Sequence, residues 1–282
     1  MAGVRAPWWA TIYVLVPIFS GFVWLGMLLG MLLWWAVGKH KAHLSPMEPS
    51  QHISYISDIG ALELQPLFIS MGTVTVVSFT SVFVTERWLR HRGTIARNTS
   101  SFQKLLSVLA TLFAIAGMIG LIILTCRNNV DYSNVHDACL VVFIAGYIIS
   151  AIFVCWEYQR LGFHYRDHRI LRVSFWLKLA FIVVELSLAI AFAVLGKQDR
   201  YNAAAVCEWI VAFIYTFYVW SYAIDFIPAV RTEHYASKET VVAMAESSKT
   251  ASRMGGYPDG VGQEEAALGA TDGIRGQQPR YF

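Results

Sequence analysis

Charged residues are scarce in this chain of 282 residues: Asp, Glu, Lys and Arg together make up 15% of it, whereas hydrophobic residues make up 56%. The mean hydropathy is +0.49, which is too apolar for an ordinary soluble domain. The net charge is only +3, and the distribution of basic residues does not suggest nucleic-acid binding. The composition leaves no room for a separate soluble catalytic domain and predicts a membrane protein.

Cysteine is also rare, and its spacing excludes a disulfide or metal-ligand framework. Cys126 and Cys139 fall near the same predicted membrane face and could be bridged, but isolated thiols in apolar helices are the simpler interpretation. Phosphate-binding glycine loops, nucleophile elbows and His-Glu-x-x-His helices are missing from the sequence. We therefore expect no catalytic residue, no metal and no cofactor.

What the sequence does contain is a series of six long apolar runs separated by short polar loops. A helical span of a bilayer needs about 20 mostly apolar residues. Within lipid, backbone polar groups must be paired inside their own segment, which favours helices. We predict spans at 11–37, 64–86, 105–125, 137–156, 174–196 and 204–227. The expected fold is all-α, a bundle of six transmembrane helices over residues 1–229.

The chain changes character after about residue 230, where Gly, Ser, Glu and Gln become frequent. Such a segment cannot bury enough apolar surface to offset the entropy of ordering. We therefore predict a mostly disordered cytoplasmic tail over residues 230–282, with a short helix over 236–250 as a local exception.

Lys and Arg are distributed unequally between the two sets of loops. The loops after the second and fourth predicted spans carry nine of these residues, and the loops on the other side carry five. Basic residues of short loops stay in the cytoplasm, which places both termini in the cytosol and leaves the sequon at Asn98 without a glycan. The residues expected to contact anionic lipid are Arg87, Arg90, Arg92, Arg166, Arg169 and Arg172.

Polar residues gather at the end of the loop between the first two spans, in the stretch Tyr55-Ile56-Ser57-Asp58-Ile59-Gly60-Ala61. Ser57 or Asp58 could cap the second span, and Gly60 would permit close approach. Glu63 would then lie in the first turn, where the helix dipole favours a carboxylate. The alternative is an outer-leaflet headgroup or ligand site built from Asp58 and Glu63.

Two other polar positions fall near the same predicted outer face. Glu208, next to Trp209, is either an interfacial carboxylate beside a Trp anchor or part of an outer polar cluster with Asp58 and Glu63. His136 could join this cluster or belong to the N-cap region of the fourth span.

Glu185 lies near the middle of the fifth span, where an ionised carboxylate costs about 2.5–3.5 kcal/mol. It should therefore face the bundle interior and find a partner on another helix; its depth suggests Ser78, Thr80 or Tyr215. Lys178 is two turns earlier, about 10.5 Å away along the axis, so we expect it to extend toward the cytoplasmic interface instead. Glu185 could be either a structural contact or a functional polar site.

These residues resemble the signature of a known family, the Frag/DRAM/Sfk family, also called Cwh-like N-terminal domains. The similarity covers about residues 10–230. It rests on the stretch from Tyr55 to Ala61 followed by Pro66, on His136, on Glu185, and on Cys207-Glu208-Trp209-Ile210-Val211-Ala212-Phe213. Ile59 departs from the pattern, which commonly has Thr there. The lead-in from Gln51 and the long polar tail are most similar to fungal members.

The resemblance implies a non-catalytic regulator or scaffold. The Sfk branch implies support of a phosphatidylinositol 4-kinase complex at the plasma membrane and an influence on phospholipid asymmetry, with membrane lipids, including phosphoinositides, and the lipid kinase as partners. Other branches imply a GPI-anchor lipid-remodelling factor of the Golgi or ER, or a DRAM-like modulator of autophagy in the lysosome or vacuole. A transporter or lipid scramblase that uses Glu185 is a further alternative.

Overall fold

The computed structural model describes residues 8–92, 100–164 and 169–231. The helices in chain order are α1 (Trp8–Leu33), continued by the π-helical turn η1 (Trp34–Gly38), then α2 (Ile56–Gly60), α3 (Gln65–Arg92), α4 (Ser101–Cys126), α5 (Ser133–His164), α6 (Arg169–Lys197) and α7 (Tyr201–Arg231). In the described residues six helices are long and apolar enough to cross a membrane. The predicted six-span, all-helical membrane fold is confirmed.

The helices extend further than the apolar runs that predicted them. α3 continues from the predicted end at 86 to Arg92, and α5 continues from 156 to His164. Hydropathy marks where the hydrocarbon ends, but each residue added to an existing helix gains a backbone hydrogen bond, so the helix continues into polar sequence. The tail after residue 231, the helix expected over 236–250 and the sequon at Asn98 lie outside the described residues.

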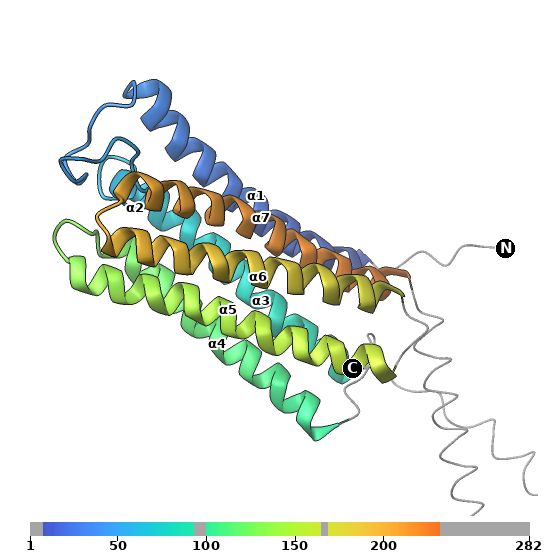
Figure 1. Cartoon of the computed structure of the whole chain (residues 1–282). Helices are drawn as coiled ribbons and strands as arrows, with labels where there is room; N and C mark the ends of the chain where they lie inside the picture. Colours follow the sequence, from blue (N-terminus) through green and yellow to red (C-terminus); the bar gives the residue numbers. More distant parts are fainter. Residues whose placement is uncertain (1–7, 93–99, 165–168, 232–282) are drawn as a thin grey trace, which may run out of the picture. The chain divides into compact units, whose positions relative to one another are not determined.

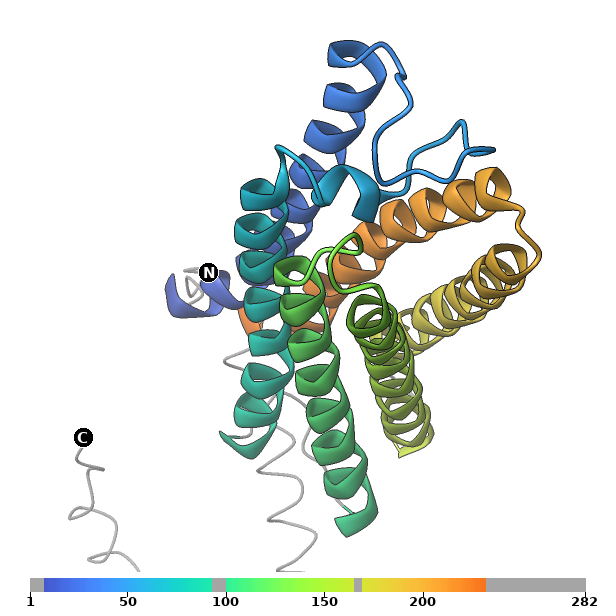
Figure 2. The same cartoon turned by 90° about the vertical axis from the view of Figure 1, so that its left-hand side faces the viewer.

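The six spans are arranged in a closed order around a common interior. α1 packs against α3 and α7, α4 against α3 and α5, and α6 against α5 and α7. Figure 1 shows the helices from the side, and Figure 2 shows them along their length from the end at which α2 lies. We call this the α2 end; there α2 contacts α1, α3 and α7.

The interior is built largely from aromatic side chains. Phe79 of α3 is completely buried, and its ring centroid lies 5.2–6.0 Å from those of Phe83, Tyr147, Tyr215, Tyr218 and Tyr222. Tryptophan N–H groups join neighbouring helices through backbone carbonyls, at 2.8 Å from Trp24 Nε1 to Ala212 O and at 3.1 Å from Trp220 Nε1 to Ile18 O. These bonds satisfy polar groups that lipid could not.

Glycines allow α4 and α5 to pack backbone against backbone. A Cβ atom at Gly146 would lie 2.7 Å from Gly117 N, and one at Gly120 would lie 2.8 Å from Phe143 N. Small residues at helix contacts are a common source of packing energy within lipid, where apolar surface alone gives no driving force for association.

α6 is much less buried than the other spans. Only 11% of its most apolar stretch is buried, against 33–44% for the others. Beyond Ile182, every residue of α6 is at least partly exposed. The half of α6 toward the α2 end therefore leaves most of its surface to lipid.

Candidate functional site

Asp58 organises the turn that carries α2. Its side chain is 1% exposed, and Oδ2 accepts hydrogen bonds from Tyr55 N at 3.0 Å and from Gln51 Nε2 at 2.9 Å. Asn129 Nδ2 donates to Oδ1 at 3.2 Å. Burial raises the pKa of Asp58 above its ordinary value, and these hydrogen bonds, with nearby His136, oppose the rise. The predicted cap exists, but it caps α2 rather than the second span.

Gly60 allows the close approach that was expected of it, because a Cβ atom there would lie 2.4 Å from Phe68 Cδ1. Glu63 does not join the cluster. It lies in the turn before α3, and its Oε1 accepts from Lys39 Nζ at 3.0 Å in an exposed ion pair. The prediction for Glu63 is wrong because α3 begins only at Gln65. Pro66 follows in the first turn of α3, exposed.

Glu208 and Trp209 of α7 hold the loop that precedes α3. Glu208 Oε2 accepts a hydrogen bond from Ile56 N at 2.9 Å, and Trp209 Nε1 donates to Ser54 O at 2.9 Å. Trp209 is only 7% exposed, so the interpretation of this residue as a lipid-interface anchor is wrong. Both side chains serve the outer polar cluster, which was the alternative.

Asn202, about two turns earlier on α7, was not predicted from the sequence. Its Oδ1 accepts hydrogen bonds from His52 N at 2.6 Å and from Ile53 N at 2.9 Å, and its Nδ2 donates to Ser50 O at 3.2 Å. An Asn in a polar stretch before an apolar run is typical of a helix start, and that local signal does not reveal a contact with a distant loop.

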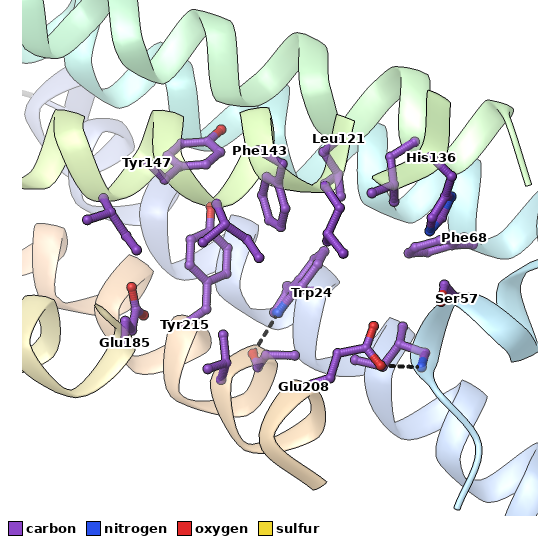
Figure 3. A pocket seen from close by; sticks show the side chains of 17 residues that line it. Trp24, Ser57, Phe68, Leu121, His136, Phe143, Tyr147, Glu185, Glu208 and Tyr215 are labelled. Carbon is purple, nitrogen blue, oxygen red and sulfur yellow. Dashed lines mark hydrogen bonds between the residues drawn. The ribbon is translucent and has the colours of Figure 1, made fainter. Parts of the chain in front are cut away.

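A cavity lies beneath this loop, lined by residues of every span and of α2. Its volume is about 90 Å³, counted as the space open to the centres of water molecules, which is room for several waters or for a stretch of alkyl chain. Figure 3 shows Glu208, Ser57 and His136 at one end of the cavity and Glu185 beside Tyr215 at the other. The walls between them are mainly apolar; they include Trp24, Phe68, Leu121, Phe143 and Tyr147.

His136 is 3% exposed and its Nδ1 lies 3.0 Å from Arg127 O, the backbone group that holds the ring in place. The structure thus gathers Ser57, Asp58, Gly60, His136, Glu208 and Trp209 at the α2 end. This grouping agrees with the outer polar cluster expected from the sequence, apart from Glu63 and Pro66.

Glu185 faces the interior, as expected, but the expected protein partner is missing. Its buried Oε1 makes no hydrogen bond to any described residue, and the same is true of the Tyr215 hydroxyl. Ser78 and Thr80 bond elsewhere: Ser78 Oγ donates to Val74 O at 2.6 Å, and the Thr80 hydroxyl lies 3.0 Å from that of Tyr147.

The prediction that Lys178 extends toward the cytoplasmic interface is wrong. Its side chain is completely buried rather than extended to the interface, with Nζ 2.6 Å from Asp225 Oδ2 and 2.8 Å from Ser174 Oγ. Nζ also lies 4.2 Å from the centroid of the Tyr222 ring. Desolvation inside the bundle is offset by a carboxylate from α7, a partner that the sequence of α6 alone cannot reveal.

Arg90 is also buried rather than exposed to lipid. We expected it to contact anionic lipid, but its side chain is 4% exposed and its guanidinium lies 2.7 Å from Glu86 Oε1 and 3.7 Å from Glu157 Oε1. The Tyr158 hydroxyl donates to the same Glu86 oxygen at 2.6 Å. The spacing of Glu86 and Arg90, four residues apart on a helix, was a signal that could have indicated this pair.

The charged surface at the end opposite α2 is basic. Its exposed ionic side chains, among the described residues, are Arg87, Lys104, Arg160 and Arg172, and we call this set the basic face. The acidic residues described there, Glu86, Glu157 and Asp225, are buried. The side chains of Arg92, Arg166 and Arg169 lie outside the described residues.

All four cysteines are free thiols, so Cys126 and Cys139 are not bridged. No group of His, Cys, Asp and Glu that could hold a metal ion occurs in the part of the chain that the structure describes.

Comparison with known proteins identifies the family. The chain is 31% identical over 233 residues to Protein sfk1 of Schizosaccharomyces pombe, covering 83% of this chain and 69% of the relative. It is 29% identical over 178 residues to Protein SFK1 of Saccharomyces cerevisiae, covering 54% of this chain and half of the relative. No solved structure matches it. Residues 12–229 match the family described as Frag1/DRAM/Sfk1/Cwh43P N-terminal domain, and the chain belongs to this family of integral membrane proteins.

Proposed function

We propose that this protein is a non-catalytic regulator of the plasma membrane that gathers anionic inositol lipids and supports a phosphatidylinositol 4-kinase complex, with an influence on phospholipid asymmetry. Its similarity to the two Sfk proteins supports this branch of the family over the others. The observation that carries the proposal is the basic face, where the described exposed charges are all positive.

The physical argument rests on the difference between the two ends of the bundle. The α2 end exposes charges of both signs, including Lys41, Glu48, Asp131, Lys197 and Asp199. The basic face exposes only positive ones among the residues described, which is the pattern of a cytoplasmic surface. Each such charge contributes about 1 kcal/mol of attraction near an anionic leaflet, so the face would enrich inositol lipids beside the bundle.

A double substitution that removes two positive charges from the basic face tests this proposal. Arg87→Gln with Lys104→Gln should lower plasma-membrane phosphatidylinositol 4-phosphate, read with a fluorescent lipid sensor in cells that lack the native gene. Lys197→Gln with Arg200→Gln, which removes two exposed charges at the α2 end, is the matched control and should leave the level unchanged. Unchanged phosphatidylinositol 4-phosphate and unchanged leaflet asymmetry after complete deletion of the gene would reject the proposal.

The GPI-remodelling alternative requires acid and base groups at the α2 end, where Asp58, His136 and Glu208 gather. Each of these side chains already holds a backbone group, those of Tyr55, Arg127 and Ile56. That use favours a structural role. Altered GPI lipids in cells carrying Glu208→Gln at normal expression would favour the alternative instead.

A further inference from the structure

The cavity combines two carboxyl groups with apolar walls. Glu185 and Glu208 both line it, and no Lys or Arg side chain does so among the described residues. His136 is the one lining side chain there that could become cationic, and its Nδ1 is engaged by Arg127 O. A ligand that carried a phosphate or a carboxylate would lose its hydration there without gaining a compensating cation, which is strongly unfavourable at low dielectric.

The end of the cavity at Glu185 has free hydrogen-bonding capacity. Glu185 Oε1 and the Tyr215 hydroxyl are both buried and make no hydrogen bond to a described residue. Buried polar groups are normally satisfied, so the unpaired carboxyl oxygen of Glu185 in the cavity wall points to a missing partner. Figure 3 shows the Tyr215 hydroxyl turned toward Tyr147 and the Glu185 carboxyl near the base of the Tyr215 side chain.

Aromatic rings surround the same place. The centroid of Tyr147 lies 5.8 Å from that of Tyr215 and 5.7 Å from that of Phe143, and Phe143 and Tyr215 are 6.3 Å apart. All three residues line the cavity. Aromatic faces together with a carboxylate are the surroundings that favour an ammonium group over a neutral polar group.

Apolar side chains of α6 next to this end of the cavity are exposed on the surface of the bundle. Val183, Val184 and Leu186, the neighbours of Glu185 on α6, are 56%, 42% and 40% exposed. The ribbons of α5 and α6 diverge toward the α2 end (Figure 2), and the two helices pack against each other. The loop above the cavity is held to α7 by hydrogen bonds. The exposed apolar side of α6 is therefore the surface that borders lipid next to Glu185.

We propose that this cavity binds a long-chain amine from the bilayer. The ammonium group lies between Glu185 and the rings of Tyr147 and Tyr215, and the alkyl chain follows the apolar wall and leaves between α5 and α6. An amine without phosphate fits this site better than a phospholipid headgroup, because nothing in the lining would neutralise the phosphate.

Photolabelling of the full-length protein in phosphatidylcholine nanodiscs tests the proposal. Hexadecylamine with a photoreactive group on its chain should label residues of the cavity wall, identified by peptide mass spectrometry. Unlabelled hexadecylamine should suppress this labelling at a concentration about tenfold below that of hexadecanol, hexadecanoic acid or hexadecylphosphocholine, since only the amine brings a cation without an accompanying anion to the buried carboxyl group. Equal competition by the alcohol, the acid or the phosphocholine overturns the proposal.

Substitutions of Glu185 and Tyr215 test whether these two residues are responsible for the labelling. Glu185→Gln, which keeps the shape but removes the charge, should lower labelling about tenfold, and Tyr215→Phe should lower it by a smaller factor. Glu63→Gln, an exposed carboxylate outside the cavity, is the matched control. Labelling of Glu185→Gln at the native level overturns the proposal. If that variant does not fold, native-level labelling of Tyr215→Phe together with competition by hexadecanol overturns it.

Discussion

The buried pair between Lys178 and Asp225 offers the sharpest test of how this bundle is stabilised. Both side chains are almost fully buried, at 0% and 3% exposed. Replacing Lys178 by Met keeps much of the side-chain volume but leaves the Asp225 carboxylate in the interior with only the Ser174 hydroxyl as a strong donor in the described structure. Breaking a buried pair in this way costs about 3–5 kcal/mol.

That cost is a large part of a typical folding free energy of about 5–15 kcal/mol. At about 2–4 °C per kcal/mol for a domain of this size, the Tm of Lys178→Met in mild detergent should fall by about 6–20 °C. The double variant Lys178→Met with Asp225→Leu removes both charges, and an apolar pair of similar volume is often neutral. It should therefore recover most of the lost stability.

The matched control is Lys39→Met, because the ion pair of Lys39 with Glu63 is exposed at 38% and 68%. Exposed pairs contribute at most about 1 kcal/mol, so this variant should unfold near the native temperature. A Lys178→Met protein that also unfolds there, or a double variant as unstable as the sum of the two single ones, would refute the reasoning.

Two further predictions concern helix packing and pH. Gly146→Ala should destabilise the protein by about 1–3 kcal/mol in thermal unfolding, because the new Cβ lies 2.7 Å from Gly117 N; Gly196→Ala, with no atom within 4 Å, should not. Burial raises the pKa of Asp58, so its contribution to stability is largest below the unfolded pKa and is lost as the pH rises through the folded pKa. As the pH rises above about 4, the unfolded pKa of an Asp, the native protein should lose stability relative to Asp58→Asn, and parallel stability curves for the two proteins would contradict this.

The spans could be predicted because the bilayer imposes one strong rule, which is that long apolar runs must be helices. The short helix α2 escaped prediction, since its five residues, Ile56–Gly60, have no periodic pattern and depend on Asp58 and Glu208 for their caps. The grouping of Asp58, His136 and Glu208 followed from depth alone.

The charged residues were harder to place. Lys178 was expected to extend to the interface and Arg90 to contact anionic lipid, but each is compensated inside the bundle by carboxylates. The partner of Lys178 is 47 positions away on another helix, and no local pattern encodes it. For Arg90, the intrahelical spacing from Glu86 was available and favoured a pair.

The hydrogen bonds between α7 and the loop before α3 join side chains of the helix to backbone groups of the loop. Asn202, Glu208 and Trp209 contribute side chains, whereas the loop contributes only main-chain amides and carbonyls, in five hydrogen bonds. A substitution of a loop residue such as His52 therefore leaves its backbone hydrogen bond to Asn202 intact. Proline is the exception, because it has no amide hydrogen. Side chains of α7 therefore hold the loop in place, and substitutions at His52 or Ile53 that keep the backbone amide should leave these bonds intact.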